Sequence, residues 1–339
     1  MKDSQIVTHD DPRFAVALEA VAPVAEEDHP AFGAFGRAYY PAALAGLAMD
    51  VSVAVFGGHG VELVLLGSIQ QDEISYFGMP MQPRFARGLS EKRMRSSLGT
   101  ALAYLAERFP SASCRIADPE CGQASDLGRI MLAMGASPTV VVEAVASLEG
   151  SEADLLRPLR KSYRSLVNWG RRSLNLTHIN RENPDRAGFD RYREFHLKVA
   201  GRVTRPLDSW NIMFDTLKRG MGELSLGEDM QGRLLAATLV IDGAAVAQYA
   251  SAVYEREEFD QPLAHWPVVS AMLRAKDRGM KYFDLGVIPS QDAASEKEFN
   301  IGRFKRGFTD RFVYRIVWTL PLQRMLMNEQ SHAGNLNVR

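Results

Sequence analysis

The chain has 339 residues, of which 46 % are hydrophobic and 24 % charged, and its formal net charge is −1 at pH 7. This length exceeds one ordinary hydrophobic core and suits two domains of globular composition. The balanced charge excludes a polycation that binds nucleic acid through its overall charge, so an anion site has to come from local clustering.

The chain shows no pattern of a secreted, membrane or metal-binding protein. Cys114 and Cys121 do not stand at zinc spacing with another cysteine or a histidine, and two unpaired thiols are typical of a reducing compartment. Residues 1–12 are polar and acidic, and the most apolar stretch, residues 41–55, is interrupted by Asp50. We therefore expect a cytoplasmic protein without a transmembrane helix or a metal site.

The first half alternates short strands with two helices. The turn at residues 57–60 favours a hairpin, Ser90 is a candidate helix N-cap, and Pro110 is a stop signal. The predicted elements are strands 51–56, 61–66 and 72–76, a helix 91–109, a strand 113–117, a helix 127–134 and a strand 139–146.

The second half follows a similar order. Ser151 with Asp154, and Ser295 with Glu298, resemble capping boxes, and Asp242 with the glycine after it is a hairpin signal. The predicted elements are a helix with apolar spacing over 155–167, helices 189–199 and 209–219, strands 234–241 and 245–252, a helix 267–278, a strand 281–287, a helix from 295 to 307 and a strand 312–318.

The two halves repeat an order of elements, although they do not repeat a sequence. This repeat favours a duplicated mixed α/β domain over one large sheet. We predict an N-terminal domain over residues 1–136, a C-terminal domain over 137–324 and a tail over 325–339.

Four short segments resemble the FemAB family of aminoacyltransferases when they are taken together and in order. The first ends the opening meander, the second is a basic helix, the third is a strand end after a long helix, and the fourth is a late Phe-Lys motif. The segments are residues 76–80 (YFGMP), 159–166 (LRKSYRSL), 282–286 (YFDLG) and 301–308 (IGRFKRGF), and they spread over about residues 50–320.

This resemblance implies two tandem GNAT-like domains and the transfer of an amino acid from aminoacyl-tRNA to an amine of a cell-wall precursor. Related sequences are acetyltransferases, so the fold does not fix the substrate. Enzymes that bind acetyl-CoA carry an Arg/Gln-x-x-Gly-x-Gly/Ala loop before a helix, whose backbone amides hold the pyrophosphate. Neither residues 95–100 nor the run before Pro267 fits that loop, which weakens the acyl-CoA interpretation.

Lys305 is the first candidate for the chemistry. Attack of an amine on an ester or thioester requires loss of a proton, alignment and stabilisation of the oxyanion, and a fixed cation serves the last need. The resemblance implies that role for Lys305, with Phe304 beside it. The alternatives are a lysine that favours the carbonyls of a last helical turn, and a phenylalanine of the core.

Asp284 stands at a strand end ahead of Gly286, and clefts of α/β folds open at strand ends. It is a candidate to orient or deprotonate the amine, with a structural carboxylate as the alternative. His265 is a weaker candidate base, and packing at the entry of a helix explains it better.

A basic cluster extends from Arg157 to Arg172 without an acidic residue. Arg160, Lys161 and Arg164 belong to it and are candidates to bind the phosphates of tRNA or of a nucleotide-linked precursor. A solvated helix surface is the alternative.

Two further groups are candidates for substrate binding. Arg202, Thr204 and Arg205 precede a helix and suit a diphosphate, unless they form ordinary loop salt bridges. Tyr249 and Tyr254 lie on or just after a hairpin strand, where they either line the acceptor site or pack the sheet.

The sequence leaves three functions open. The first is a FemAB-like aminoacyltransferase that uses charged tRNA, the second an acyl-CoA-dependent N-acyltransferase on a sugar or amino acid, and the third a binding module without transfer activity. In the first two, the donor is a co-substrate and no tightly bound cofactor is expected. The expected acceptor is a nucleotide-linked precursor, a sugar or an amino acid, with surface-polysaccharide synthesis as one setting.

Overall fold

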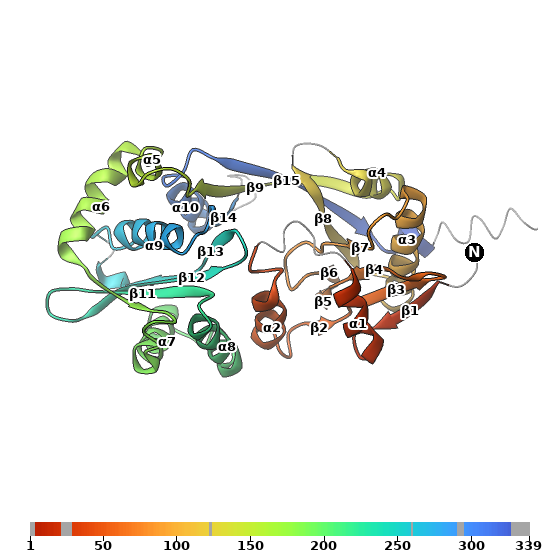
Figure 1. Ribbon diagram of the computed structural model, residues 1–339, viewed down its shortest axis with the longest axis horizontal. Helices are drawn as coiled ribbons and strands as arrows, with labels where there is room; N and C mark the ends of the chain where they lie inside the picture. The colour runs from red at the N-terminus through yellow and green to blue at the C-terminus, as the bar shows by residue number, and fades with distance from the viewer. Residues whose placement is uncertain (1–3, 22–28, 122–123, 259, 290–294, 327–339) are drawn as a thin grey trace, which may run out of the picture. The chain divides into compact units, whose positions relative to one another are not determined.

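The computed structural model describes residues 4–21, 29–121, 124–258, 260–289 and 295–326, and it has a mixed α/β fold (Figure 1). The chain forms two compact units that are discontinuous in sequence. The first unit comprises Met1–Glu26, Leu44–Val141 and Tyr314–Arg339, and the second comprises Glu27–Ala43 and Val142–Val313.

These units differ from two consecutive domains divided after residue 136. Strand β9 (Ser137–Ser147) begins in the first unit and ends in the second. Strand β15 (Phe312–Pro321) begins in the second unit and ends in the first. The segment Glu27–Ala43 also belongs to the second unit, although it lies near the start of the chain. The expected tail lies outside the described residues from 327 onward.

The first unit contains short strands, most of them antiparallel, together with helices. Its four-stranded sheet has the order β1-β3-β4-β7, and α1 packs against β3 and β4. The bounds are β1 Gln5–Thr8, α1 Pro12–Ala20, β2 Met49–Asp50, β3 Val53–Gly57, β4 Gly60–Leu65, β5 Ser68–Gln70, β6 Glu73–Ser75, β7 Arg84–Phe85, α3 Glu91–Arg108, β8 Ser113–Cys121 and α4 Asp126–Ala133.

The second unit holds six strands, in the order β10-β11-β12-β13-β14-β9, of a sheet that has eleven strands within the described residues, so the expectation of no large sheet was wrong. Neighbouring strands run antiparallel except β13 and β14, which are parallel and joined through the crossover helix α9. The bounds are β10 Asn175–Ile179, β11 Gly222–Glu228, β12 Leu234–Asp242, β13 Val246–Tyr254, α9 His265–Asp277 and β14 Tyr282–Ile288.

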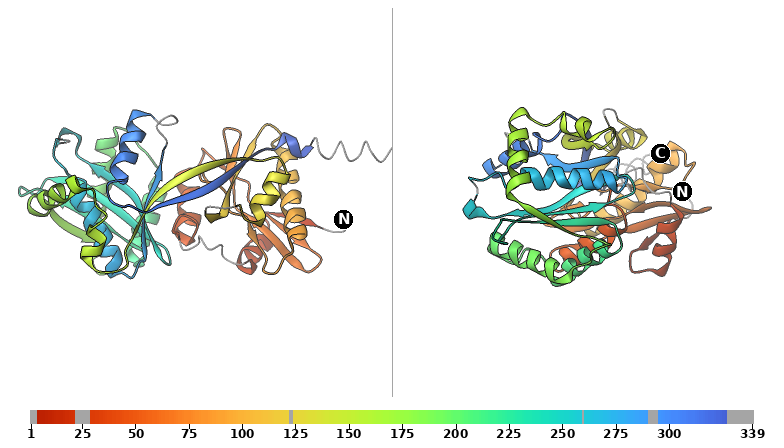
Figure 2. Two further views of the ribbon diagram at one scale, coloured as in Figure 1. Left: turned by 90° about the horizontal axis from the view of Figure 1, so that it is seen from above. Right: turned by 60° about the vertical axis from the view of Figure 1, so that its left-hand side comes forward.

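Helices cover both faces of this sheet (Figures 1 and 2). One face packs on α5 (Glu152–Leu156), α6 (Lys161–Ser173) and α9 around buried Phe283 and Phe308, with α10 (Glu296–Lys305) at β14. The other face packs on α7 (Arg186–Ala200) and α8 (Leu207–Lys218), and α2 (Ala34–Ala43) packs against α8.

The capping and hairpin signals read from the sequence are confirmed, but the helix predicted over 155–167 is divided into α5 and α6. Ser90 caps α3, both capping boxes form with their reciprocal hydrogen bonds, and β12 and β13 make the expected hairpin. Elements that the sequence analysis missed include helices α1 and α2 and strands β10 and β11. None of the helices within the described residues combines the length and the apolar character needed to span a bilayer.

Candidate functional site

The parallel strands β13 and β14 pair over only a short length. Their register joins Val246 to Tyr282, Ala247 to Phe283 and Gln248 to Asp284, and the described residues show no pair beyond these three. Strand β14 nevertheless continues to Ile288, paired with β9 on its other side. In the described part of the chain, the backbone groups of β14 beyond Asp284 that face the β13 side are not paired with β13 and can bind other groups.

Polar side chains of β14 and β9 share one face of the sheet, and a bulge in β14 shifts the register beside them. Asp284 lies opposite Val145 of β9, but Gly286 lies opposite Ala144, so Leu285 is an extra residue. Because residues directly opposite each other point to the same face, Asp284 shares the face of Val145 and therefore of Glu143, two residues away on β9. The bulge adds Val287 to that face, because it places Val287 rather than Gly286 opposite Glu143. Without the extra residue, the alternation of a regular strand would separate Asp284 from Val287.

Asp284 is held at both carboxylate oxygens. Its Oδ1 accepts a hydrogen bond from the backbone N–H of Gly286 at 2.7 Å, and its Oδ2 lies 2.9 Å from Nε2 of His29. The side chain is 11 % exposed, which leaves limited access from solvent. Asp284 is thus fixed in one orientation, but it is the third residue of β14 and the last that pairs with β13, rather than a residue at the end of the strand as predicted.

Glu143 was not predicted as a site residue. Burial, together with the negative charge of Asp284, raises the pKa of Glu143 to about 7, against the opposing effects of His29 and Lys305. A carboxyl group with this pKa can accept a proton at neutral pH. The available signal was a single charged residue within the β-branched and apolar run of residues 139–146.

Lys305 lies in the last turn of α10 and is half-buried. Its Nζ donates to the carbonyl oxygen of Val287 at 3.2 Å, within the open part of β14. Burial lowers the pKa of Lys305, and the charges of Asp284 and Glu143 oppose that shift. The ammonium of Lys305 therefore interacts with the carboxylates of Asp284 and Glu143, in addition to lying near the C-terminal carbonyls of α10.

Gly286 makes room for this ammonium. Its φ is +86°, and a Cβ at this position would lie 3.0 Å from Nζ of Lys305. A side chain at residue 286 would be strained by the backbone conformation and would crowd the ammonium. This explains the glycine at the end of the segment 282–286.

Tyr40 of α2 also contributes to this group. Burial raises the pKa of Tyr40 to about 12, and the charges of Tyr39 and Asp284 act in the same direction. The phenol is therefore protonated at neutral pH and can donate a hydrogen bond. We call the group formed by His29, Glu143, Asp284, Lys305 and Tyr40 the Lys305 site; all of its members belong to the second unit.

Phe304 points into the aromatic packing beside the site. Its ring packs edge-on against Phe308 at 4.9 Å and against His265 at 5.4 Å between centroids, and its carbonyl accepts from the Tyr163 hydroxyl. His265 likewise packs edge-on against Tyr163 at 4.4 Å. These contacts account for Phe304 and His265 as packing residues, and a catalytic role for Phe304 remains a prediction.

The basic cluster lies at the start of α6, beside the end of α10. The Arg160 guanidinium donates to the carbonyl of Arg303 at 3.1 Å and lies over the Tyr163 ring, and its backbone N–H donates to the carbonyl of Gly307 at 2.8 Å. Lys161 and Arg164 are exposed. The structure thus brings together two basic segments that are about 140 residues apart in sequence.

The other two predicted groups have local partners. Arg205 donates to the Tyr39 hydroxyl at 3.0 Å and lies over the Trp210 ring, while Arg202 and Thr204 are exposed. The hydroxyls of Tyr249 and Tyr254 lie 2.8 Å apart. Burial raises the pKa of both phenols, as expected of a pair within the sheet packing. Their substrate-binding roles remain predictions.

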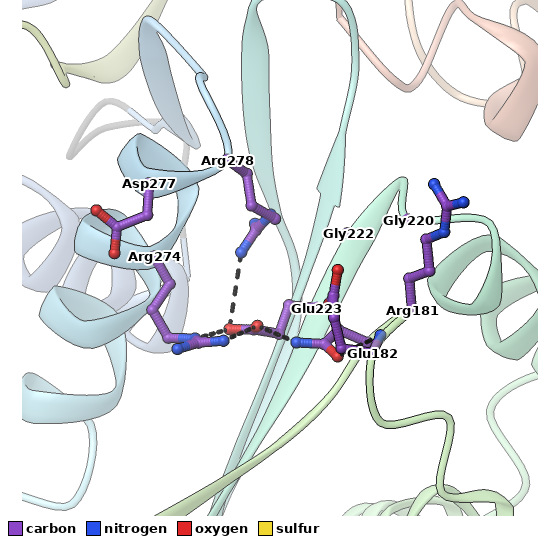
Figure 3. Close-up of a pocket in the computed structure, with 9 residues that line it drawn as sticks. Arg181, Glu182, Gly220, Gly222, Glu223, Arg274, Asp277 and Arg278 are labelled. Atoms are coloured by element: carbon purple, nitrogen blue, oxygen red, sulfur yellow. Dashed lines mark hydrogen bonds and ion pairs between the residues drawn. The ribbon is translucent and has the colours of Figure 1, made fainter.

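A separate cavity of about 320 Å³ lies beside α9 and β11 (Figure 3). Arg274 and Arg278 reach from α9 toward Glu223, and Arg181 lies on the other side of the lining, away from Glu223. The full lining is Asn180, Arg181, Glu182, Gly220, Gly222, Glu223, Arg274, Asp277 and Arg278.

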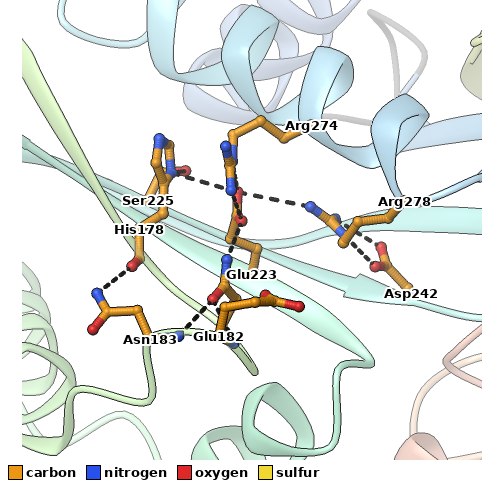
Figure 4. A network of polar contacts seen from close by, with 9 residues as sticks. His178, Glu182, Asn183, Glu223, Ser225, Asp242, Arg274 and Arg278 are labelled. Atoms are coloured by element: carbon orange, nitrogen blue, oxygen red, sulfur yellow. Dashed lines mark hydrogen bonds and ion pairs between the residues drawn. The ribbon is translucent and has the colours of Figure 1, made fainter.

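Three charged residues of this cavity, Glu223, Arg274 and Arg278, belong to an ion network (Figure 4). Glu223 is 2 % exposed and forms a bidentate salt bridge with Arg274. It also accepts a hydrogen bond from the side-chain amide of Asn180 at 2.9 Å. Arg278 forms a second two-pronged pair with Asp242, at 2.5 and 3.0 Å. Burial raises the pKa of Glu223, but hydrogen bonds from Arg274 and Asn180 outweigh it and leave the pKa below its usual value. The network ties α9 to β11 and β12, so we assign it to stability.

The segment between β13 and α9 does not suit a pyrophosphate. Its described residues carry Glu255, Glu257, Glu258 and Asp260 against a single cation, Arg256. The first turn of α9 contains Pro267, which has no N–H to donate, and its N-cap makes no side-chain hydrogen bond. The run before Pro267 therefore presents an acidic segment and a helix start with few donors to an anion.

No protein-family model and no curated protein sequence matches the chain. Solved structures similar in fold include FemX, with a TM-score of 0.57 and 13 % identity over 92 % of this chain and 96 % of that chain. L-PGS from Bacillus licheniformis has a TM-score of 0.55 and 11 % identity, with 96 % of each chain covered. A tandem GNAT protein from the clavulanic acid biosynthesis pathway has a TM-score of 0.54 and 15 % identity over 94 % and 98 %. The chain therefore has the tandem GNAT-like fold that its motifs predict.

Proposed function

We propose that this protein transfers an aminoacyl or acyl group from an activated ester to an amine at the Lys305 site. The observation that carries the proposal is the arrangement of one ammonium and two carboxylates at the open end of β14. Lys305 can stabilise the oxyanion, Glu143 can accept a proton, and Asp284 can orient a substrate ammonium. These are the three requirements of amine attack on a carbonyl.

The proposed reaction forms a C–N bond and breaks the C–O bond of the ester. One proton of the acceptor ammonium passes to Glu143 and then to water. The neutral nitrogen attacks the carbonyl carbon, whose oxygen becomes negatively charged beside Lys305. When this intermediate collapses, the second proton passes from nitrogen to the leaving oxygen, so an amide and a free hydroxyl are the products.

Two observations favour an RNA-borne donor over acyl-CoA. The first is the basic ridge, which we define as Arg160, Lys161, Arg164, Arg303 and Arg306; it lies at the start of α6 and the end of α10. The ridge adjoins Lys305, and neither residues 160–164 nor residues 302–307 contain an acid. Cations in such a row suit successive phosphates of a nucleic acid strand.

The second observation is the acidic segment before α9, which would repel the pyrophosphate of CoA. The resemblance to the FemAB family supports the same donor and suggests an amine of a cell-wall or surface-polysaccharide precursor as the acceptor.

The experiment is a thermal-shift panel with the full chain, comparing charged tRNA, uncharged tRNA, acetyl-CoA and UDP-linked cell-wall precursors. A ligand at 100 times its Kd adds about 2.7 kcal/mol of stability, which is a measurable shift of Tm. We expect charged tRNA to stabilise the protein and RNase to abolish the effect. Stabilisation by acetyl-CoA alone would instead support the acyl-CoA-dependent alternative.

A further inference from the structure

We propose that His29 is a positioning residue that holds Asp284 in place and exchanges no proton with the substrate. The inference rests on the function proposed above for the Lys305 site and deepens it, because it divides the roles of two neighbouring titratable groups. It is carried by the hydrogen bonds of the imidazole ring and by the turn that presents the ring.

Both ring nitrogens of His29 are engaged. Nδ1 lies 3.2 Å from the backbone N–H of Ala31, which can only donate, so Nδ1 is the acceptor. The ring proton of the neutral imidazole is then on Nε2, which lies 2.9 Å from Oδ2 of Asp284 and donates to it. A substrate proton could enter the ring only at Nδ1, and the N–H of Ala31 already occupies that lone pair.

The hydrogen bond from His29 complements the one from Gly286. One fixes Oδ2 of Asp284 and the other fixes Oδ1, so the carboxylate has a donor at each oxygen. The side chains of His29 and Asp284 are only 18 % and 11 % exposed. A buried charged hydrogen bond of this kind restrains the side chain more strongly than an exposed one.

A tight turn presents His29 to Asp284. Ala31 is fully buried, and the backbone N–H of Gly36 donates to the carbonyl of Pro30 at 3.1 Å. A Cβ on Gly36 would lie 1.6 Å from the carbonyl oxygen of Ala31, so this approach requires glycine. The turn leads directly into α2, which packs against α8. His29 is therefore placed by a packed element rather than by a free chain end.

The titratable groups that face this pair come from three other elements. They are Glu143 of β9, Lys305 of α10 and Tyr40 of α2, and each of them interacts electrostatically with Asp284. Among these groups, Glu143 has the pKa suited to accepting a proton at neutral pH. The division of roles follows: Glu143 takes the proton, while His29 keeps Asp284 oriented.

Three substitutions separate positioning from proton exchange. The side-chain amide of His29→Gln can donate from near the position of Nε2, while that of His29→Asn can replace only Nδ1 as the acceptor for Ala31. Neither amide takes up a proton at neutral pH. We expect His29→Gln to keep kcat/KM within about threefold of the wild type, because the hydrogen bond to Asp284 survives.

We expect His29→Asn and His29→Ala to reduce kcat/KM about 10- to 100-fold, because the carboxylate is no longer held. The Asn variant also keeps the turn at Ala31, so its reduced rate would not come from a misfolded turn. An equal reduction in all three variants would overturn the inference, because a histidine that exchanges a proton can be replaced by none of these residues.

A second readout does not depend on transfer activity. ¹⁵N NMR of the imidazole rings in the full chain, with the His29 signal assigned from the His29→Gln spectrum, reports which nitrogen carries the proton. At neutral pH we expect a protonated Nε2 and a bare Nδ1. A proton on Nδ1 would contradict the inference. If the wild type showed no transfer but the ring showed the expected tautomer, the proposed function would fail while the geometry of His29 would stand.

Discussion

The Nζ of Lys305 lies 3.2 Å from the carbonyl oxygen of Val287, and Val287 lies opposite Glu143 in the register of β9 and β14. This relationship links the cation of the motif 301–308 to a carboxyl group that the motif does not contain. The contact between Lys305 and Val287 is possible because β14 continues past its last pair with β13, so that the carbonyl oxygen of Val287 is not used by β13.

Replacement of Lys305 by methionine keeps the length of the side chain and removes its charge. We expect kcat to fall about 10²- to 10³-fold, as when one donor of an oxyanion site is removed. The control is Lys297→Met, at an exposed position of the same helix. Near-normal turnover of a folded Lys305→Met variant would remove this residue from the mechanism.

The rate is expected to depend on the ionisation of Glu143. Because burial and Asp284 raise the pKa of Glu143 to about 7, the group becomes able to accept a proton only as the pH rises through that value. The wild-type kcat/KM should therefore increase from about pH 6 to about pH 8. Glu143→Gln should be slow and should lack this increase; a profile unchanged by the substitution would assign the ionisation to another group.

Gly286→Ala tests the space around the ammonium. The positive φ predicts a decrease of about 1–2 kcal/mol in stability for any residue with a Cβ. Gly279 has a similar φ of +89°, but no atom lies within 4 Å of its potential Cβ, so Gly279→Ala is a matched control. We expect similar shifts of the denaturation midpoint in both variants and reduced transfer only in Gly286→Ala. Equal activity of the two variants would contradict the predicted crowding of Lys305.

The basic ridge predicts a salt-dependent interaction with RNA. Substituting Lys161 or Arg164 by alanine should weaken binding of charged tRNA. It should also reduce the slope of log K against log salt concentration by roughly 0.7–0.9 for each phosphate that is no longer neutralised. Arg172→Ala, an exposed position in the last turn of α6, is the control. Identical slopes for all three variants would place the RNA elsewhere.

The network around Glu223 should affect stability rather than transfer. Arg274→Met leaves the buried carboxylate without its two-pronged partner, and we expect a decrease of about 3 kcal/mol in the free energy of unfolding. The folded-state pKa of Glu223 is lowered, so its contribution is present above the usual glutamate pKa and disappears as the pH falls through the folded-state value. Glu223→Gln should flatten the acid side of the stability profile in urea titrations; an unchanged profile would contradict this.

Much of the fold follows from local patterns. Capping residues such as Ser90, Ser151 and Ser295 mark helix starts, and the turn at Asp242 joins two strands, because these signals act over a few residues. Strand β11 was missed because its buried residue Glu223 reads as polar, and only the distant Arg274 makes its burial favourable.

The candidate site was predicted in part. Lys305 and Asp284 stand in short motifs, so their residue types and spacing were visible. Glu143 joins them only through strand pairing with Val287, 144 residues away, and His29 only through its contact with Asp284, 255 residues away. The bulge at Leu285 places Val287 rather than Gly286 opposite Glu143, and a sequence pattern with a period of two does not reveal it.

The most direct test is a transfer assay with the full chain, charged tRNA and a panel of primary amines, in which amide products are identified by mass spectrometry. The account predicts an amide product that requires charged tRNA, disappears after RNase treatment, and falls about 10²-fold or more in Lys305→Met. An amide formed equally well by wild type and Lys305→Met, or formed only with acyl-CoA, would contradict it.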